Sequence, residues 1–167
     1  DLLSAAPALA ERARSCTLEP CWAVMVAFPE PLGIAFDAAF VNGSPLGWVA
    51  RNSSKPGRPE TECWILHGSP EWSRTHLEEH PEVVGGELLA AFAAATGETL
   101  PPTLHRAAHR WRYALPAAPL PEGHLWDASA RVAACGDWCH GARVEGAYLS
   151  GLEAGERVLE ALGRAGA

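Results

Sequence analysis

The order of short apolar runs along the chain constrains its fold more than any other sequence feature. Four such runs, at residues 22–28, 36–41, 46–51 and 62–67, come early and are bounded by proline, glycine or asparagine. Each has the length of a buried strand rather than of a helix. Asn42-Gly43 lies between the second and third runs, where it favours a tight hairpin turn. The runs therefore predict one mainly antiparallel sheet.

Helical signals follow the fourth run. Ser69-Pro70 offers an N-cap and a proline for the first turn, which predicts a helix to about residue 80. Pro81 opens a second predicted helix, with apolar residues on one face and an end at Gly97. Strands followed by helices, without an early alternating βαβ pattern, indicate an α+β domain whose helices cover one face of the sheet.

Two further segments also carry secondary-structure signals. Residues 2–14 are rich in alanine and leucine and predict a short leading helix. Residues 104–115 fit a strand or a helix equally well.

Composition and charge exclude several classes of function. The 167 residues suffice for one compact domain, and a net charge of −7 with scattered basic residues argues against nucleic-acid binding. No apolar run reaches membrane-spanning length, and the first residues lack a signal-peptide pattern. The five cysteines match no disulfide scaffold, so we expect a reducing, cytoplasmic setting.

Metal and hydrolase chemistry find little support. His105 and His109 are spaced i, i+4, as are Cys135 and Cys139, with His140 next. A structural zinc site needs four ligands, and neither pair has a complementary second pair, so we expect no zinc. No nucleophile-elbow motif supports a serine or cysteine hydrolase.

The strongest chemical signal lies in residues 132–154. A predicted strand at 131–135 enters a turn at Gly136-Asp137, followed by a predicted helix at 141–162 that is rich in small residues. Gly136 would permit a tight turn, and Asp137 would offer a carboxylate to a hydroxyl-bearing group. Unpaired N–H groups at the helix start would favour electron-rich atoms. A glycine-capped strand–helix junction that binds nothing explains this pattern equally well.

The stretch 136–151 is similar to the second flavin-binding motif of the amine-oxidase superfamily. In those proteins the acid after the glycine contacts the ribityl chain of FAD, which implies that role for Asp137. The following helix start lies under the pyrimidine side of the flavin ring, where it suits the negative charge of reduced flavin at N1. N–H groups near Arg143, Val144 and Glu145 would then face N1 and O2. The implied cofactor-binding residues are Gly136, Asp137, Gly141, Arg143, Val144, Glu145, Gly146 and Ala147.

The upstream half resembles the substrate domain of renalase-like bacterial flavoproteins. The likeness covers nearly the whole chain from about Pro20, in the family's order, through residues 20–28, 39–41, 44–58, 67–73 and 109–114. It implies an FAD-dependent oxidoreductase that passes hydride from a dihydropyridine, such as an isomer of reduced nicotinamide nucleotide, or from an amine-type substrate to flavin and then to oxygen. We expect no catalytic acid–base residue, because hydride transfer from such a ring needs none.

The same likeness implies a set of substrate-binding residues. They are Asn52, Lys55, Arg58, His67, Trp111, Arg112 and Tyr113. Without the resemblance, these residues have plainer interpretations. Residues 52–59 have the composition of a solvated loop, a histidine at the end of an apolar strand is usually structural, and residues 111–113 would belong to the core and its rim.

The resemblance divides the chain into a leading helix or linker at 1–19, a substrate-binding domain at 20–124 and the last strand, turn and helix of an FAD-binding domain at 125–167. Family members begin with a βαβ unit whose Gly-x-Gly-x-x-Gly holds the ADP part of FAD, and this sequence contains no such motif. The chain therefore corresponds to the C-terminal part of the family's fold.

A second interpretation comes from a different class of function. The chain would be a non-catalytic fragment or partner domain that binds a protein carrying the nucleotide-binding half. An open strand edge and an apolar helix face would then favour a homodimer or a bound partner. The predicted last helix carries an apolar stripe from Val144 to Leu162, which we expect to pack independently of any cofactor.

Overall fold

The computed structural model describes residues 2–165, which form two compact units. Residues 20–114 form one, here called the sheet unit. Residues 2–19 and 115–165 form the other, here called the C-terminal unit. The expected substrate-binding domain ran to residue 124, whereas residues 115–124 cluster with the C-terminal unit, as does the leading helix.

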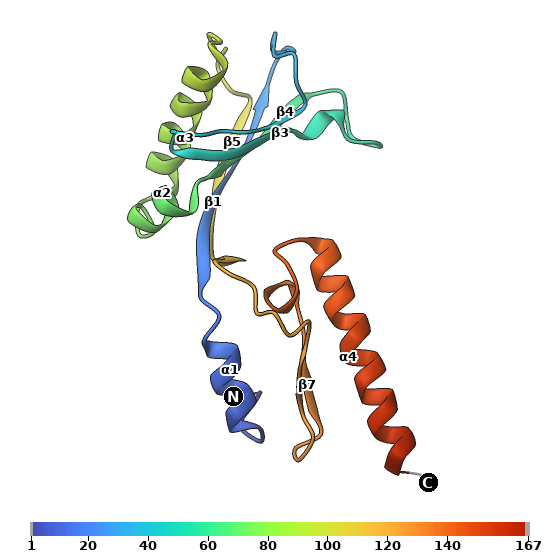
Figure 1. The fold of residues 1–167 in the computed structure, drawn as a ribbon. Coiled ribbons are helices and arrows are strands. Elements are labelled where there is room, and N and C mark those ends of the chain that lie inside the picture. Colours follow the sequence, from blue (N-terminus) through green and yellow to red (C-terminus); the bar gives the residue numbers. More distant parts are fainter. Residues whose placement is uncertain (1, 166–167) are drawn as a thin grey trace. The chain divides into compact units, whose positions relative to one another are not determined.

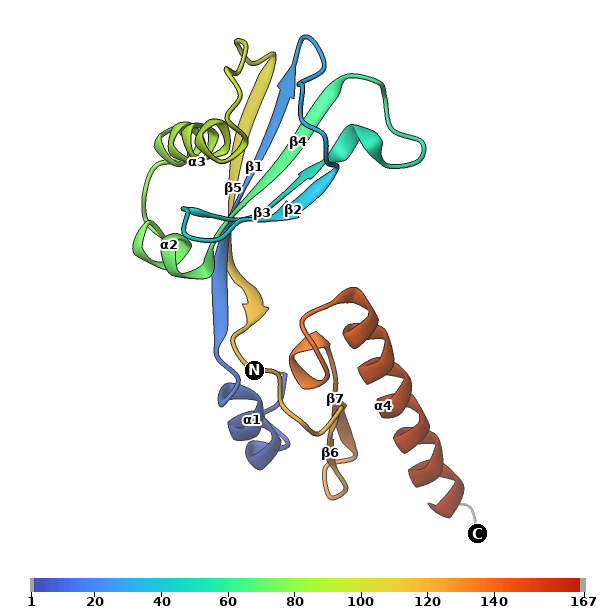
Figure 2. The same ribbon diagram turned by 45° about the horizontal axis from the view of Figure 1, so that its top comes forward.

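The sheet unit is built on a five-stranded sheet of order β2–β3–β4–β1–β5 (Figures 1 and 2). Pairs β1–β4, β2–β3 and β3–β4 are antiparallel, as predicted. The four predicted strands are confirmed, although β1 is longer and β2 shorter than expected, and the ambiguous residues 104–115 fall in a strand. The strands are β1 (Leu18–Phe28), β2 (Ala38–Phe40), β3 (Leu46–Arg51), β4 (Glu62–Gly68) and β5 (His105–Pro116).

Turn and cap residues of this unit act as the sequence predicted. Gly43 has φ of +65° in the β2–β3 hairpin, a left-handed conformation that glycine adopts without strain. Ser69 caps α2 (Pro70–Thr75) by accepting the N–H of Trp72. Gly97, with φ of +73°, closes α3 (Pro81–Thr96).

Helix α2 ends at Thr75, earlier than expected. The hydroxyl of Thr75 donates to the carbonyl of Trp72, and the His76 ring nitrogen lies 2.8 Å from the same oxygen. The His76 ring also stacks on the Trp72 ring, with their centroids 4.1 Å apart. The backbone carbonyl of His76 accepts the indole N–H of Trp22. Side chains thus occupy the backbone acceptor near the helix end and fix its termination.

Alternation along β1 assigns one face of the sheet to the core. Trp22, Val24, Val26 and Phe28 are buried, whereas Met25 is 38% exposed. Helices α2 and α3 lie on the buried face (Figures 1 and 2). The core cluster also contains Ile34, Leu46, Val49, Trp64, Leu66, Val84, Leu88 and Phe92.

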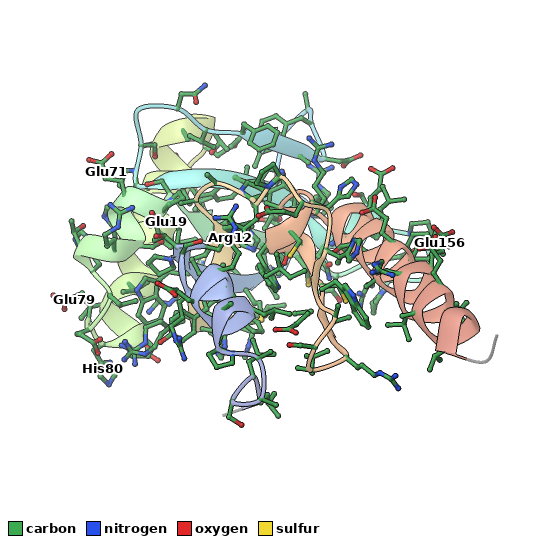
Figure 3. The ribbon with its side chains drawn as sticks, turned by 60° about the horizontal axis from the view of Figure 1, so that its bottom comes forward. Arg12, Glu19, Glu71, Glu79, His80 and Glu156 are labelled. Carbon is green, nitrogen blue, oxygen red and sulfur yellow. The ribbon has the colours of Figure 1, made fainter. Side chains whose placement is uncertain are left out.

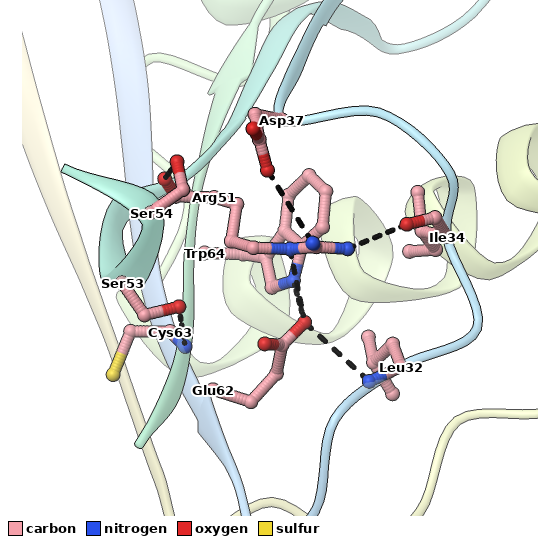
Figure 4. Close-up of polar contacts among 9 residues, drawn as sticks. All are labelled: Leu32, Ile34, Asp37, Arg51, Ser53, Ser54, Glu62, Cys63 and Trp64. Atoms are coloured by element: carbon pink, nitrogen blue, oxygen red, sulfur yellow. Dashed lines mark hydrogen bonds and ion pairs between the residues drawn. The ribbon is translucent and has the colours of Figure 1, made fainter. Parts of the chain in front are cut away.

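A polar cluster fastens the loop before β2 to this core (Figure 4). Arg51 stacks over Trp64 at 5.0 Å and donates to the carbonyl of Ile34 at 2.6 Å. Its Nε lies 3.3 Å from Glu62 Oε1, the same oxygen that accepts the Trp64 indole N–H at 2.8 Å. Glu62 is only 7% exposed, so the arginine charge balances a nearly buried carboxylate.

The C-terminal unit contains α1 (Pro7–Arg14), the hairpin β6 (Leu125–Asp127)–β7 (Val132–Ala134), a 3₁₀ turn (Asp137–Cys139) and α4 (Val144–Ala165). Strand β6 was not predicted. Asp127 marks its end, because the carboxylate accepts the N–H groups of Ser129 and Ala130 at 2.9 Å and so closes the hairpin.

The core cluster of the C-terminal unit is formed by Ala6, Leu9, Leu120, Leu125 and Cys139. In the same unit, Arg12 projects from α1 and pairs with Glu122 (Figure 3). Figure 3 also labels three exposed residues of the sheet unit, which lie on the outside of its helical layer: Glu71, Glu79 and His80.

Helix α4 packs through a different face from the one expected. The buried positions are Gly146, Ser150 and Ala154, all small. The stripe that we expected to pack is largely exposed, because small residues permit the close backbone approach and larger ones then point outward. This exposed stripe consists of Val144, Tyr148, Leu152, Leu159 and Leu162. Within residues 2–165, no helix has the length and apolar character needed to cross a membrane.

Candidate functional site

The turn after β7 depends on a glycine. Gly136 has φ of +153° and ψ of 174°, a region that is essentially confined to glycine. A Cβ there would overlap the Trp138 ring. The carbonyl of Asp137 accepts the N–H groups of His140 at 3.2 Å and Gly141 at 2.8 Å, which curls the chain toward α4.

The carboxylate of Asp137 differs from that of Asp127 in the same unit. Asp127 Oδ1 accepts the hydroxyl and N–H of Ser129 and the N–H of Ala130, which lower the pKa of its carboxyl, the Ser129 hydroxyl most of all. Across residues 2–165, the Asp137 carboxylate has no hydrogen-bond partner. Asp127 is therefore a structural turn residue, whereas the carboxylate oxygens of Asp137 accept no hydrogen bond from the described residues.

The start of α4 offers backbone donors. The N–H of Arg143 donates to the carbonyl of Gly141 at 2.7 Å, so it is used within the turn itself. The N–H of Ala147 is bonded back to the carbonyl of Arg143 at 3.0 Å. The N–H groups of Val144, Glu145 and Gly146 lie in the first turn of α4, where N–H groups have no acceptor within the helix. Of the three donors expected to face flavin, two thus belong to this free set.

A hollow of about 450 Å³ lies at this helix end. That volume is within the range of small-ligand sites. A Cβ on Gly146 would overlap the carbonyl of Gly141, so the helix begins in contact with the turn. Four of the predicted cofactor residues line the hollow, while Gly136, Asp137, Val144 and Ala147 do not. The lining consists of Pro119, His140, Gly141, Ala142, Arg143, Glu145, Gly146 and Leu149.

The sheet unit presents a second candidate surface, on the face opposite its helices. Trp48 pairs with His67 across β3 and β4, with their ring centroids 5.2 Å apart. Phe40, opposite Trp48, is 84% exposed. Met25 lies on the same face through its pairing with Ile65. We call this surface the open sheet face.

Two of the predicted substrate residues, Asn52 and Lys55, lie together near the start of β4, and a third, His67, lies near its end. Lys55 Nζ donates to Asn52 Oδ1 at 3.1 Å, beside the 3₁₀ turn Asn52–Ser54. Burial lowers the pKa of His67, and the positive charge of Lys55 lowers it further. Both effects favour the neutral form of the imidazole over the charged form. Arg58 lies in the same loop and is exposed.

The predicted residues of β5 divide between the two faces of the sheet. Trp111 and Tyr113 lie on the open sheet face, 55% and 76% exposed, and His109 lies 4.6 Å from Trp111 in an edge-on arrangement. Arg112 points the other way and forms a two-pronged pair with Glu78 at 2.7 and 3.0 Å. The hydrogen bond from Arg112 lowers the pKa of Glu78. Arg112 thus lies on the opposite face of β5 from its sequence neighbours Trp111 and Tyr113.

Sequence reasoning missed Trp48 and Ser150. Trp48 would have been found by extending the two-residue period of β3 through the hairpin register, because it faces the same way as His67. Ser150 belongs to the motif stretch, but its role depends on contacts with distant segments.

Within residues 2–165, no group of three or more His, Cys, Asp or Glu side chains could hold a metal ion.

The comparisons with known proteins address the fold. No family model matches the sequence. The structure is similar to the crystal structure of a protein from Exiguobacterium sp. 255-15 described as a "putative protoporphyrinogen oxidase", with a TM-score of 0.67 and 14% sequence identity. The two proteins share a fold. The similarity covers 90% of this chain and 37% of that one, so the present chain spans little more than a third of its neighbour.

At 14% identity the similarity defines architecture only. It does not test the resemblance to renalase-like proteins. The activity, cofactor and substrate of the present chain are therefore inferred from its own residues.

Proposed function

We propose that this chain is part of an FAD-dependent oxidoreductase, and that its C-terminal unit holds the ribityl and pyrimidine portions of the flavin. The observation that carries the proposal is the free carboxylate of Asp137 beside a glycine-only turn. A carboxylate that serves the fold is normally bonded within it, as Asp127 is. The unpaired N–H groups at the start of α4 and the hollow beside them supply the rest of the cradle.

The residues present fit one end of FAD and not the other. Asp137 would accept hydrogen bonds from ribityl hydroxyls, while the N–H groups of Glu145 and Gly146 would face electron-rich atoms of the ring. When bound, the flavin would supply the hydride acceptor. The sequence has no glycine-rich pyrophosphate loop, so the ADP portion finds no matching segment in these residues.

We further propose that the open sheet face supplies the substrate site. Trp48, Trp111 and Tyr113 offer flat surfaces for stacking against a planar ring. Asn52 and Lys55 offer donors for a carboxamide or anionic substituent, and His67 adds a polar group on the open sheet face. This chemistry supports a dihydropyridine substrate of the renalase-like type. The absence of disulfides among the described cysteines supports the cytoplasmic location.

The test is a binding titration with parts of the cofactor. Riboflavin and FAD should bind the chain with similar affinity, and ADP should not bind, because the cradle addresses only the ring and the ribityl chain. Asp137→Ala should weaken riboflavin binding by about ten- to a hundredfold. Asp127→Ala is the matched control, which should lower the melting temperature and leave riboflavin affinity unchanged.

Two results would contradict the proposal. ADP binding as strong as that of FAD would show a different nucleotide site. An unchanged riboflavin affinity in Asp137→Ala, with a lowered melting temperature, would make Asp137 a structural cap.

A second candidate function is supported by the exposed stripe of α4. Monomeric soluble proteins rarely expose contiguous apolar patches of large area, so this stripe favours a partner surface. The chain would then act as a domain that pairs with a nucleotide-binding domain. Flavin binding that appears only after addition of such a domain would favour this candidate over binding by the chain alone.

A further inference from the structure

One face of α4 contacts both ends of the turn that precedes it. Gly146 lies against the carbonyl of Gly141, at the end of the turn. One helical turn later, Ser150 bonds to Gly136, where the turn begins. The residues are spaced i, i+4 on one helix face, so a single rigid element sets both ends of the segment that carries Asp137.

The hydroxyl of Ser150 is the most restricted group in this arrangement. The residue has no exposed surface. Its oxygen accepts the N–H of Gly136 at 2.9 Å and donates its single hydrogen to the carbonyl of Gly123 at 2.5 Å. The bond from the Gly136 N–H fixes the Cys135–Gly136 peptide, and Gly136, in its glycine-only conformation, then turns the chain into Asp137.

Glu153, one turn further along α4, links the same two segments. One carboxylate oxygen lies 3.7 Å from His124 Nδ1 and the other lies 3.7 Å from His140 Nε2. A Cβ on Gly123 would overlap the Glu153 carboxylate, so the loop is in contact with the helix here. Two side chains of α4 therefore hold the loop at Gly123-His124 and the turn at once.

We propose that Ser150 is a positioning residue for flavin binding: through Gly136 it sets the direction of the Asp137 carboxylate, and through Gly123 it fixes the turn to the neighbouring loop. The inference rests on the proposed function of Asp137. Ser150 itself touches no part of the flavin and acts only through the backbone.

The experiment compares two equally buried serines. Ser150→Ala should weaken riboflavin binding by about fivefold, the effect of losing one hydrogen bond. Ser73→Ala is the matched control, because Ser73 is also fully buried and its Oγ accepts the N–H of Trp22 at 3.1 Å in the sheet unit. It should lower the melting temperature to a similar extent and leave riboflavin affinity unchanged. If Ser150→Ala fails to fold, the near-isosteric Ser150→Cys provides a smaller loss in the same direction.

A second readout does not depend on flavin. In Ser150→Ala without ligand, hydrogen exchange at the N–H of Gly136 should accelerate by about fivefold or more, whereas exchange at the N–H of Ala130, held by Asp127, should not change. A structural effect spread over the whole unit would accelerate both.

The outcomes separate this inference from the proposed function. If Asp137→Ala weakens riboflavin binding and Ser150→Ala does not, the positioning role is wrong and the proposed function stands. If the wild-type chain binds riboflavin and neither variant changes the affinity, both are wrong. Loss of affinity in Ser73→Ala equal to that in Ser150→Ala would reduce the role of Ser150 to stability and overturn the inference.

Discussion

The two units of the molecule use their apolar residues in opposite ways. The sheet unit buries Trp22, Phe28, Trp64 and Phe92 completely against one face of its sheet. In the C-terminal unit, the core cluster consists of smaller residues, and α4 turns its small face inward and its large apolar residues outward. The sheet unit is organised around a core, whereas the C-terminal unit is organised around the turn that α4 supports.

The difference has a physical consequence for stability. Burial of apolar area stabilises a fold roughly in proportion to the area removed from water, so the sheet unit should be the more stable of the two. Local unfolding begins where buried apolar contacts are few. A unit that holds a ligand site with hydrogen bonds and close backbone contacts, rather than with a large core, should be stabilised further when the ligand binds.

The largest effect is expected from Trp64→Ala in the sheet unit. The change removes a fully buried aromatic ring that is the stacking partner of Arg51 and the donor to Glu62. Replacement of a buried tryptophan by alanine costs about 3–5 kcal/mol, which we expect to measure by urea unfolding. Trp111→Ala, on the open sheet face, is the control and should stay within about 0.5 kcal/mol of wild type. Equal losses in the two variants would contradict the assignment of faces.

A slightly smaller effect is expected from Glu62→Ala. The variant leaves the guanidinium of Arg51 without its nearly buried partner and the Trp64 indole N–H without an acceptor. Such changes cost about 3 kcal/mol. The double variant with Arg51→Met should recover part of the loss, which a double-mutant cycle would measure. Asp37→Ala removes the more exposed carboxylate on the same arginine and should cost less than about 1 kcal/mol.

The residues around Trp64 and Glu62 also show how far the sequence could predict the fold. The short apolar run at 22–28, bounded by prolines, predicted a strand, and Asn42-Gly43 predicted the hairpin, because both depend on local chemistry. The stacking of Arg51 on Trp64 could not be predicted, since it requires the register between β3 and β4.

The candidate site shows the same division. The requirement for glycine at position 136 follows from the local turn, and sequence reasoning recognised it. The part played by Ser150 depends on Gly123, which is distant in sequence, so no local pattern indicates it. Likewise, the neighbours Trp111 and Arg112 face opposite ways, which a motif cannot show but a strand makes inevitable.

Within the C-terminal unit, Leu125→Ala should cost about 2 kcal/mol, the lower end for a buried leucine, because its cluster is small and partly open. Hydrogen exchange should show the loss in the hairpin and α4 and leave the strands of the sheet unit protected. A uniform loss of protection in both units would show that they unfold as one, and would contradict the expected difference in their stability.

The exposed stripe of α4 should tolerate charge. Leu152→Glu with Leu159→Glu should change the free energy of unfolding by no more than about 0.5 kcal/mol, since both side chains are exposed. The same variant should reduce self-association, measured by sedimentation velocity, if the stripe is a partner surface. Ala154→Glu, on the buried face of the helix, is the contrasting variant and should prevent α4 from packing.

The smallest expected effect is the pH dependence contributed by His67. Burial, with help from Lys55, lowers the pKa of His67 below its usual value of 6.5, so the folded protein favours the neutral ring. The unfolded chain then binds a proton more readily, and linkage requires that stability falls as the pH is lowered from about 6.5 through the pKa of the folded state. Above that range the contribution is fully present. His67→Gln cannot take up the proton, so its free energy of unfolding should fall less steeply on the acid side than that of wild type. If the free energy of unfolding depends on pH with the same slope in wild type and His67→Gln, His67 is solvated in the folded protein. It would then no longer count among the residues that the open sheet face could use as neutral donors or acceptors.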